Sequence, residues 1–198
     1  MWHGPREEIS QKEYDTNPCI IVMHERKVIL YIAMSLDVYI AGPSGEIEFL
    51  SSMDKAGEDY GYANFLKEID TIIIGRKTFD KLKEMGYQYP HTDKKVYIIT
   101  HTTKPDIGTF EYYTGNLTTL ISKIKNLPGK HIYCDGGADL ATALLQENLI
   151  DEILISIIPM VLGEGIRLFK SGIPSQRLKL LETKYFEKGL VRLHYCKE

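Results

Sequence analysis

Residues 131–158 read HIYCDGGADLATALLQENLIDEILISII, and this stretch predicts a strand, a helix and a second strand. The HIYC and EILISII segments are apolar runs typical of buried strands, and a helix is predicted over 138–147 between them. The glycine pair at 136 and 137 marks the turn from strand to helix. A helix that joins two strands is typical of a parallel sheet, because parallel neighbours need a crossover connection. The stretch therefore indicates an α/β fold.

The same alternation of strands and helices continues along the chain. Strands are predicted at 28–34, 71–75, 96–100 and 110–113, and helices at about 62–69, 78–84 and 117–126. The tail differs, because strands at 178–186 and 191–196 flank Glu187, Lys188 and Gly189, which is a hairpin signal. The sequence thus predicts a three-layer α/β sandwich. Its central sheet is mostly parallel, is flanked by helices and ends in an antiparallel C-terminal hairpin.

Length and composition limit the class of protein. The chain has 198 residues, of which 43% are hydrophobic and 26% charged, and its net charge is -3. Residues 1–26 are polar, so we expect an N-terminal extension followed by a single domain over 27–198. The charge argues against a protein built to cover nucleic acid or an anionic membrane. No apolar run reaches the roughly 20 residues that cross a bilayer.

The cysteines argue against a disulfide or zinc framework. Cys19, Cys134 and Cys196 are odd in number and share no CxxC spacing. Residues 1–24 lack the basic and then apolar regions of a secretory signal. We therefore expect a cytoplasmic protein without a metal site.

Three strand ends carry residues suited to phosphate groups. Ligands of an open α/β sheet bind beyond the carboxyl ends of its strands, where loops lead into helix N-termini. The residues at the three junctions are Gly75, Arg76, Lys77 and Thr78, then Asp135, Gly136, Gly137 and Ala138, and finally Thr100, His101, Thr102, Thr103 and Lys104. Because the junctions share one architectural position, they predict three contacts to a dinucleotide.

Each junction also has a purely structural interpretation. Glycines at strand-to-helix turns often serve chain geometry, and Arg76 and Lys77 fit a solvated helix start. His101 likewise fits an ordinary surface histidine. The glycine pair lacks the GxGxxG pattern, and Asp70 stands where a P-loop needs its first glycine. ATP hydrolysis is therefore disfavoured.

Five segments of the chain occur in an order and spacing that resemble a known family. They are AMSLDVYIAG (33–42), IIIGRKTFD (72–80), VYIITH (96–101), IYCDGGADLATALLQENLIDEI (132–153) and IPMVLGEGIRLF (158–169). They resemble the motifs of the dihydrofolate-reductase-like superfamily. The greater similarity is to the branch containing the C-terminal reductase domain of riboflavin-biosynthesis deaminase/reductases. The resemblance spans about 27–198 and implies a dihydrofolate-reductase-like fold and the use of NADPH.

The resemblance implies particular contacts with the cofactor. The loop at 35–42, which ends at Gly42, would close over the nicotinamide, and backbone groups of Ala33 and Ile40 would hold the carboxamide. The first junction would cradle the pyrophosphate and the adenosine phosphate, and the glycine pair with Ala138 would bind the pyrophosphate from the other side. Leu140 would pack on the cofactor. Thr100 and His101 would flank the 2′-phosphate, and we add Lys104 as a neighbouring cation.

Two carboxylates are candidates for protonating or orienting the substrate. Asp37 is offered by the SLD motif of the riboflavin branch. Asp54 follows Phe49 with the spacing that separates an aromatic residue from the pterin-binding carboxylate in dihydrofolate reductases. Structural interpretations stay open, because Asp37 can form a turn and Asp54 can cap the following helix. We expect the substrate pocket to be lined by Phe49, Pro159, Leu162 and Gly163, although the glycines after 158 also suit a simple turn.

The expected function is an NADPH-dependent reductase that transfers a hydride to a small nitrogen heterocycle. Examples are 5-amino-6-(5-phosphoribosylamino)uracil of riboflavin biosynthesis and a dihydropterin or dihydrofolate. Val38 stands where the riboflavin branch commonly has glycine, so a non-catalytic NADPH-binding or sensory protein is the alternative. The N-terminal stretch lacks HxE and PCxxC zinc motifs, so no deaminase activity is expected. The family and the apolar C-terminal strands suggest a homodimer.

Overall fold

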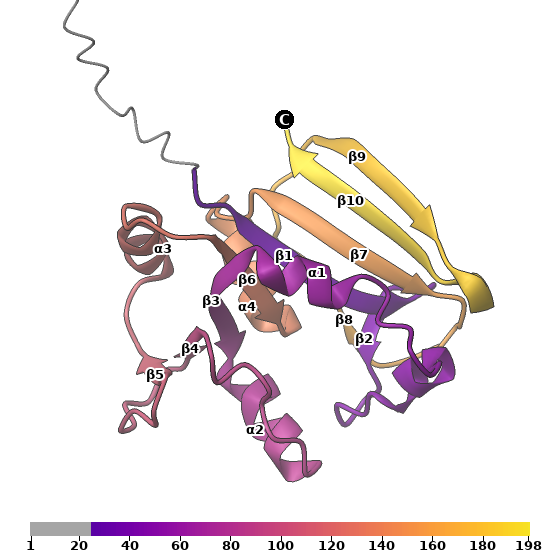
Figure 1. Cartoon of the computed structure of the whole chain (residues 1–198), viewed down its shortest axis with the longest axis horizontal. Coiled ribbons are helices and arrows are strands. Elements are labelled where there is room, and N and C mark those ends of the chain that lie inside the picture. Colours follow the sequence, from indigo (N-terminus) through magenta and orange to yellow (C-terminus); the bar gives the residue numbers. More distant parts are fainter. Residues whose placement is uncertain (1–24) are drawn as a thin grey trace, which may run out of the picture.

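Runs of isoleucine, valine and leucine form the inner strands of the sheet, because both faces of these strands are covered. The computed structural model describes residues 25–198, which are shown in colour in Figure 1. An eight-stranded sheet has the order β5-β4-β3-β6-β1-β7-β10-β9. Its strands are β1 (Val28–Ser35), β3 (Ile69–Gly75), β4 (Lys95–Ile99), β5 (Phe110–Tyr113), β6 (His131–Gly136), β7 (Glu152–Ile158), β9 (Leu178–Tyr185) and β10 (Val191–Lys197).

The sheet is parallel except at one edge. The pairs from β5 to β7 are all parallel, whereas β10 runs antiparallel to both β7 and β9. A small second sheet pairs β2 (Tyr39–Ala41) with β8 (Ile166–Arg167). The mostly parallel sheet and the antiparallel C-terminal hairpin are thus confirmed.

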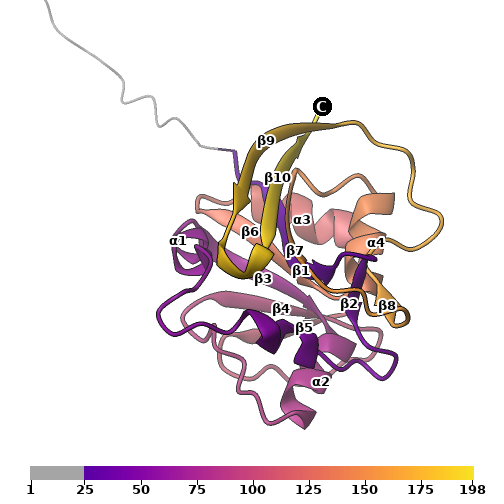
Figure 2. The ribbon, with the colours of Figure 1, turned by 90° about the vertical axis from the view of Figure 1, so that its right-hand side faces the viewer.

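Helices cover both faces of the sheet. They are α1 (Tyr62–Lys67), α2 (Arg76–Glu84), α3 (Leu117–Lys125) and α4 (Ala138–Gln146), with short 3-10 helices η1 (Glu48–Met53) and η2 (Glu187–Gly189). Side chains of α3 and α4 pack on one face in an aliphatic core, and those of α1 and α2 pack on the other in a layer rich in aromatic rings. Figure 2 shows α1 on one side of the sheet and α3 and α4 on the other. The three-layer sandwich is confirmed.

Several element boundaries differ from the sequence prediction. Helix α2 begins at Arg76 instead of Thr78, because Gly75 leads from β3 directly into the helix. Ile69, which we assigned to the apolar face of a helix, instead begins β3. The predicted loop at 35–42 contains β2, which has a partner only because β8 reaches it from 166–167. The strand assignments of Ile69 and β2 depend on pairing with residues distant in sequence.

Arg26 lies within the folded domain, although we placed it in the N-terminal extension. Its side chain is 5% exposed and donates to the carbonyl of Lys130 at 2.6 Å and to Oγ1 of Thr71 at 2.8 Å. It also forms an ion pair with Asp70. Residues 1–24 of that predicted extension, including Cys19, lie outside the described residues. Within 25–198, the helices are all too short or too polar to cross a membrane.

Glu152 forms a buried ionic cluster where β1, β7 and β10 meet. Its carboxylate accepts from Nζ of Lys27 at 2.6 Å and is 2.8 Å from Nε2 of His194. Hydrogen bonding to His194, followed by that to Lys27, lowers the pKa of Glu152 to about 2 from its ordinary 4.5. The carboxylate is therefore charged at neutral pH and contributes to stability through both partners.

We predict that Glu152→Gln lowers the free energy of unfolding at pH 7 by about 1 to 2 kcal/mol, because it removes the charged contacts of Glu152. The loss is modest because Lys27 is half exposed, and solvent weakens its ion pair with Glu152. The folded-state pKa is depressed, so the stabilisation is complete above pH 4.5 and disappears as the pH falls to about 2. Urea titrations at several pH values should show a steeper loss for the wild type than for the variant. Exposed Glu147, changed to Gln, is the matched control. Parallel curves for wild type and Glu152→Gln would contradict this role.

Candidate functional site

The three predicted junctions lie along one edge of the sheet. Parallel strands end at the same edge, and the register places Gly75 beside Ile99 and Ile74 beside Gly136. The ends of β3, β4 and β6 are therefore neighbours, with the end of β3 between the other two. The structure thus brings together the residues that the sequence suggested for a dinucleotide.

The glycine turns after β3 and β6 pack against each other. The N–H of Gly137 donates to Oγ1 of Thr78 at 2.9 Å, which links the start of α4 to the start of α2. A Cβ on Gly137 would lie 2.7 Å from that same oxygen, and one on Gly75 would lie 3.5 Å from the carbonyl of Gly136. Gly136 has φ of 87°, a region that favours glycine, and its peptide bond to Gly137 is cis. The two turns therefore approach backbone to backbone.

The two helices at this contact start without side-chain caps. Gly75 and Gly137 occupy the N-cap positions of α2 and α4, each nine residues long, and neither helix has a capping side chain. By contrast, Asn116 caps α3 by accepting from the N–H of Thr119 at 2.9 Å. The first-turn N–H groups of α2 and α4 thus lack the usual side-chain acceptor. Such N-termini attract anions through their free N–H groups and the helix dipole.

The predicted cations of α2 lie at this edge, and each has a carboxylate partner. Nε of Arg76 is 3.0 Å from Asp80, one helical turn further on. Nζ of Lys77 is 3.2 Å from Asp139 in the first turn of α4, and Asp139 also pairs with Lys170. All of these side chains are at least one-third exposed, so the pairs contribute little stability and can exchange partners.

The third junction has a well-defined local structure. Thr100 is 7% exposed, and its hydroxyl accepts from the N–H of Thr102 at 3.2 Å. His101 is exposed, and Nζ of Lys104 lies 5.5 Å from the centre of the Tyr112 ring. The Thr100 side chain thus shapes the turn, while the two basic residues remain at the surface.

Asp37 ties two loops together as a carboxylate. It accepts from the Ser35 hydroxyl at 2.6 Å and from the N–H groups of Leu162 and Gly163 at 3.0 and 2.7 Å. Hydrogen bonding to Ser35 is the main cause that lowers its pKa to about 2. A carboxylate of this kind has no proton to donate at neutral pH. The geometry therefore favours the turn-forming interpretation of Asp37, or a substrate-orienting role, over that of a proton source.

The neighbouring residue adopts an uncommon conformation. Val38 has φ of 71°, in the left-handed region. A residue with a side chain in this conformation costs about 1 to 2 kcal/mol relative to glycine. Glycine is the residue that the riboflavin branch commonly has at this position. The Asp37 contacts and the hydrogen bond from the N–H of Leu168 to the carbonyl of Val38 hold the loop in place.

Phe49 forms an apolar wall beside the end of β7. It is 8% exposed and packs in a cluster with Met53, Ile158 and Leu190, against which Ala33 and Leu162 also pack. Predicted substrate and nicotinamide residues are thus brought together there. Pro159 is exposed at the end of β7, and Gly163, also exposed, has φ of 81° in the adjoining turn.

Asp54 does not cap the following helix, contrary to our structural interpretation. It lies exposed at the end of η1, whereas the Asp59 carboxylate accepts from the N–H groups of Gly61 and Ala63 at the start of α1, both at 2.8 Å. The alternative that Asp54 caps the helix is therefore wrong, and its substrate-binding role stays a prediction.

The remaining predicted cofactor residues have mixed environments. Ile40 lies near the glycine turns, because a Cβ built on Gly137 would be 3.9 Å from its Cδ1. The N–H of Gly42 donates to the carbonyl of Glu46 at 2.8 Å. Ala138 and Leu140 are each 4% exposed. Leu140 lies on the inner side of α4 and packs in the aliphatic core. Its side chain therefore has almost no exposed surface on which a cofactor could pack in this conformation.

Asp135 has an environment that the sequence analysis missed. Its carboxylate accepts from the hydroxyls of Tyr133 at 2.5 Å and Tyr89 at 2.6 Å. Burial raises its pKa, against the opposing effect of these hydrogen bonds. Tyr133, two residues earlier on the same strand, was a local signal, whereas Tyr89 comes from a distant loop. The side chain thus points into the aromatic layer instead of joining the contact between Thr78 and Gly137.

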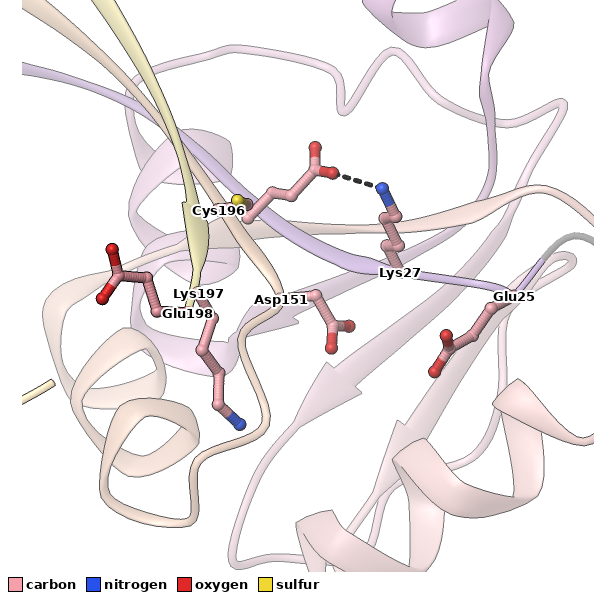
Figure 3. A pocket seen from close by; sticks show the side chains of 7 residues that line it. Glu25, Lys27, Asp151, Cys196, Lys197 and Glu198 are labelled. Carbon is pink, nitrogen blue, oxygen red and sulfur yellow. Dashed lines mark hydrogen bonds and ion pairs between the residues drawn. The ribbon is translucent and has the colours of Figure 1, made fainter. Parts of the chain in front are cut away.

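Two surface hollows lie away from this edge. One, of about 370 Å³, is at the opposite end of β1, and Figure 3 shows the ion pair of Lys27 with Glu152 in it. The labelled side chains in that view are Glu25, Lys27, Asp151, Cys196, Lys197 and Glu198. The second, of about 420 Å³, opens beside α1 and includes Tyr62 and His91. Among residues 25–198, no group of three or more His, Cys, Asp or Glu side chains is arranged to hold a metal ion.

Comparisons with known proteins agree on one family and one fold. The family model described as RibD C-terminal domain matches residues 26–192. The uncharacterized Bacillus subtilis protein YwjB is 38% identical over 176 residues, which cover 87% of this chain and 99% of YwjB. A Shewanella sp. PV-4 protein provisionally assigned to riboflavin biosynthesis has a TM-score of 0.79 at 26% identity, covering 87% of this chain and 99% of its own.

A solved dihydrofolate reductase shares the fold. The Enterococcus faecalis enzyme, in complex with NADP(H), has a TM-score of 0.64 at 15% identity, and the match covers 88% of this chain and 98% of that one. The predicted dihydrofolate-reductase-like fold is thereby confirmed.

The contact between the glycine turns can be tested at Thr78. We predict that Thr78→Val destabilises the protein by about 1 to 3 kcal/mol, because the N–H of Gly137 loses its acceptor. Thr78→Ser keeps the hydroxyl and should retain most of the stability. Chemical denaturation followed by circular dichroism measures both variants. Equal losses for Val and Ser would show that the hydrogen bond is unimportant.

Proposed function

The chain belongs to the RibD C-terminal domain family, and from this premise we propose that it is an NADPH-dependent reductase of a small nitrogen heterocycle. The observation that carries the proposal is the meeting of two uncapped helix N-termini at Gly75 and Gly137. Phosphate oxygens would supply the acceptors that these N-termini lack. The absence of side chains on both glycines lets a pyrophosphate approach the backbone closely.

The residues present suit NADPH. Arg76 and Lys77 at the start of α2 can exchange their exposed carboxylate partners for phosphate. His101 and Lys104, at the end of the neighbouring strand β4, would contact the 2′-phosphate that distinguishes NADPH from NADH. When bound, NADPH supplies a hydride to an acceptor carbon.

The protein's own residues would position the reacting groups. Backbone groups of Ala33 and Ile40 would hold the nicotinamide carboxamide, and Asp37 would keep the intervening loop closed through its contacts to Leu162 and Gly163. Phe49 and its cluster would exclude water from one side of the substrate. These are roles in binding, orientation and exclusion of solvent.

The substrate class follows from the family. A reductase role in riboflavin biosynthesis makes 5-amino-6-(5-phosphoribosylamino)uracil the first candidate, and the shared fold makes a dihydropterin or dihydrofolate the second. We expect the purified protein to oxidise NADPH in the presence of one of these compounds, measured by the loss of nicotinamide absorbance. The free thiols Cys134 and Cys196 agree with action in a reducing compartment, which we propose to be the cytoplasm.

A non-catalytic NADPH-binding or sensory protein is the second candidate. The strained Val38 favours it, because a side chain there narrows the room for loop movement during turnover. The two candidates differ in one measurement. A binding protein would bind NADPH without oxidising it in the presence of either heterocycle. A reductase would bind NADPH and also oxidise it.

We predict that NADPH binds more tightly than NADH. The double change His101→Ala and Lys104→Ala should raise the Kd of NADPH about tenfold or more, equivalent to the roughly 1.5 to 3 kcal/mol of a charged contact, and leave that of NADH nearly unchanged. Titrations followed by the fluorescence of the reduced cofactor measure both constants. Lys123→Ala, an exposed change on α3, is the control. Equal affinities of the wild type for the two cofactors would remove this specificity assignment.

We further propose that the protein is a homodimer formed through β9. Every residue of this outer strand is exposed, and its apolar side chains include Leu180 at 49% and Leu181 at 46% exposed. The outer edge of β9 can pair antiparallel with the same edge of a second copy, which would cover the exposed apolar side chains of both copies. The strand is therefore complementary to itself, as a two-fold interface requires.

The prediction is that Leu180→Lys converts a dimer to a monomer without loss of folding, since the side chain is already half exposed. Light scattering after size-exclusion chromatography gives both masses. Lys123→Ala should stay dimeric. A monomeric wild type at micromolar concentration would rule out this interface.

A further inference from the structure

A carboxylate and two ammonium groups meet beside the contact between the glycine turns. Asp139 lies in the first turn of α4, two residues after Gly137, and its two carboxylate oxygens pair with different lysines. Nζ of Lys77, in the first turn of α2, is 3.2 Å from Oδ2, and Nζ of Lys170 pairs with Oδ1. Hydrogen bonding to Lys170, followed by that to Lys77, lowers the pKa of Asp139 from its ordinary 3.8. Asp139 is therefore a charged carboxylate that partly neutralises both cations.

Lys170 reaches this place from a segment that the sequence analysis did not assign to the cofactor. It follows β8 by three residues, and Leu168, fully buried in the aliphatic core, anchors the segment. The N–H of Leu168 also donates to the carbonyl of Val38 at 3.1 Å. These contacts hold the backbone two residues before Lys170. The start of α4 is thus flanked by one lysine from α2 and another from the segment after β8.

The charge of Asp139 has two opposite effects at the start of α4. A carboxylate in the first turn of a helix interacts favourably with the helix dipole. The same charge opposes the approach of a phosphate to that N-terminus, and its hydrogen bonds occupy donors of the two lysines. The side chains of Lys77, Asp139 and Lys170 are 92%, 60% and 45% exposed, so each ion pair is weak. An anion that reaches this place can therefore displace the carboxylate.

Asp139 lies on the side of the site where the pyrophosphate is expected. The strand order places β6, and with it the start of α4, on one side of β3, and places β4 on the other. We proposed the 2′-phosphate contacts, His101 and Lys104, at the end of β4. The group nearest to Asp139 would then be the pyrophosphate, which NADPH and NADH share. Any effect of Asp139 on affinity should therefore be the same for both cofactors.

We propose that Asp139 is an internal competitor for the pyrophosphate of the cofactor, and that Lys170 is a further cation that binds this pyrophosphate. The inference rests on the proposed binding of NADPH. The carboxylate and the pyrophosphate compete for the same two ammonium groups, so Lys77 and Lys170 must leave Asp139 before they contact phosphate oxygens. Asp139 thus keeps the affinity for the cofactor below the value that the two cations would give alone.

The first test compares the wild type with Asp139→Asn by fluorescence titration of NADPH and NADH. We expect both Kd values to fall by about threefold to tenfold, the equivalent of one or two exposed ion pairs, with their ratio unchanged. Thermal unfolding without cofactor should give an equal or lower Tm, because the variant loses its ion pairs and a favourable charge at the helix N-terminus. Tighter binding without a gain in stability is a result that a merely structural role does not give.

The matched control is Asp93→Asn. Asp93 is also an exposed aspartate in an ion pair with a lysine, Lys94, but it lines the hollow beside α1, away from this edge. Its replacement should leave the Kd values of both cofactors unchanged.

The second test is a double-mutant cycle between Asp139 and Lys170. Lys170→Met should raise both Kd values by about twofold in the wild type and by about fivefold or more when combined with Asp139→Asn. The larger loss is expected because Lys170 then gives up no carboxylate partner when it binds phosphate. Simple repulsion between Asp139 and the phosphate would instead give additive changes. Since Lys170 is half exposed, Lys170→Met also tests its contact with the cofactor if Asp139→Asn folds poorly.

The outcomes separate this inference from the function on which it rests. A wild type that binds neither NADPH nor NADH overturns the proposed cofactor, and the competition with it. If the wild type binds cofactor, the competition alone is overturned when Asp139→Asn binds it no more tightly or when the cycle is additive. A tighter Kd for NADPH alone would overturn the assignment of Asp139 to the pyrophosphate. An unchanged Kd in Lys170→Met, alone and in combination, would remove Lys170 from the cofactor site.

Discussion

The close approach of the two glycine turns at Gly75 and Gly137 is the constraint on which the candidate functional site depends. The hydrogen bond from the N–H of Gly137 to Thr78 joins the first turns of α2 and α4. A Cβ on Gly137 would lie only 2.7 Å from that hydroxyl oxygen, so this geometry requires glycine there. Two helix N-termini without side-chain caps thereby face the same space. The sheet supplies this proximity, because β3 and β6 are parallel neighbours that end together.

The two faces of the sheet have different chemical characters. The face under α3 and α4 is a mostly aliphatic core that includes Leu140 and Leu144. The opposite face packs aromatic rings under α1 and α2, and their hydroxyls satisfy the buried Asp135. Phenols are large enough to fill a core and still present a polar group. That face can therefore hold an ionisable side chain in the interior.

Two carboxylates, Asp37 and Asp135, have pKa values that their surroundings shift in opposite directions. Asp37 accepts from two backbone N–H groups and a serine hydroxyl, which favours its ionised form. Asp135 is enclosed by apolar and aromatic groups, and burial favours its protonated form. One carboxylate thus holds a loop, and the other lies in the aromatic layer, where it accepts from two phenol hydroxyls.

The sequence by itself determined the elements that depend on local pattern. The apolar runs, the glycine turns and the Glu187–Gly189 turn defined most strands, the order of helices and the position of the three junctions, because each is encoded within a few adjacent residues. Tertiary structure alone decided which distant groups meet. It brought Leu162 to Asp37, placed Tyr89 on Asp135 and turned Leu140 into the core. Contacts between residues far apart in the chain leave no periodic signal, and the charge state of a carboxyl group depends on those contacts.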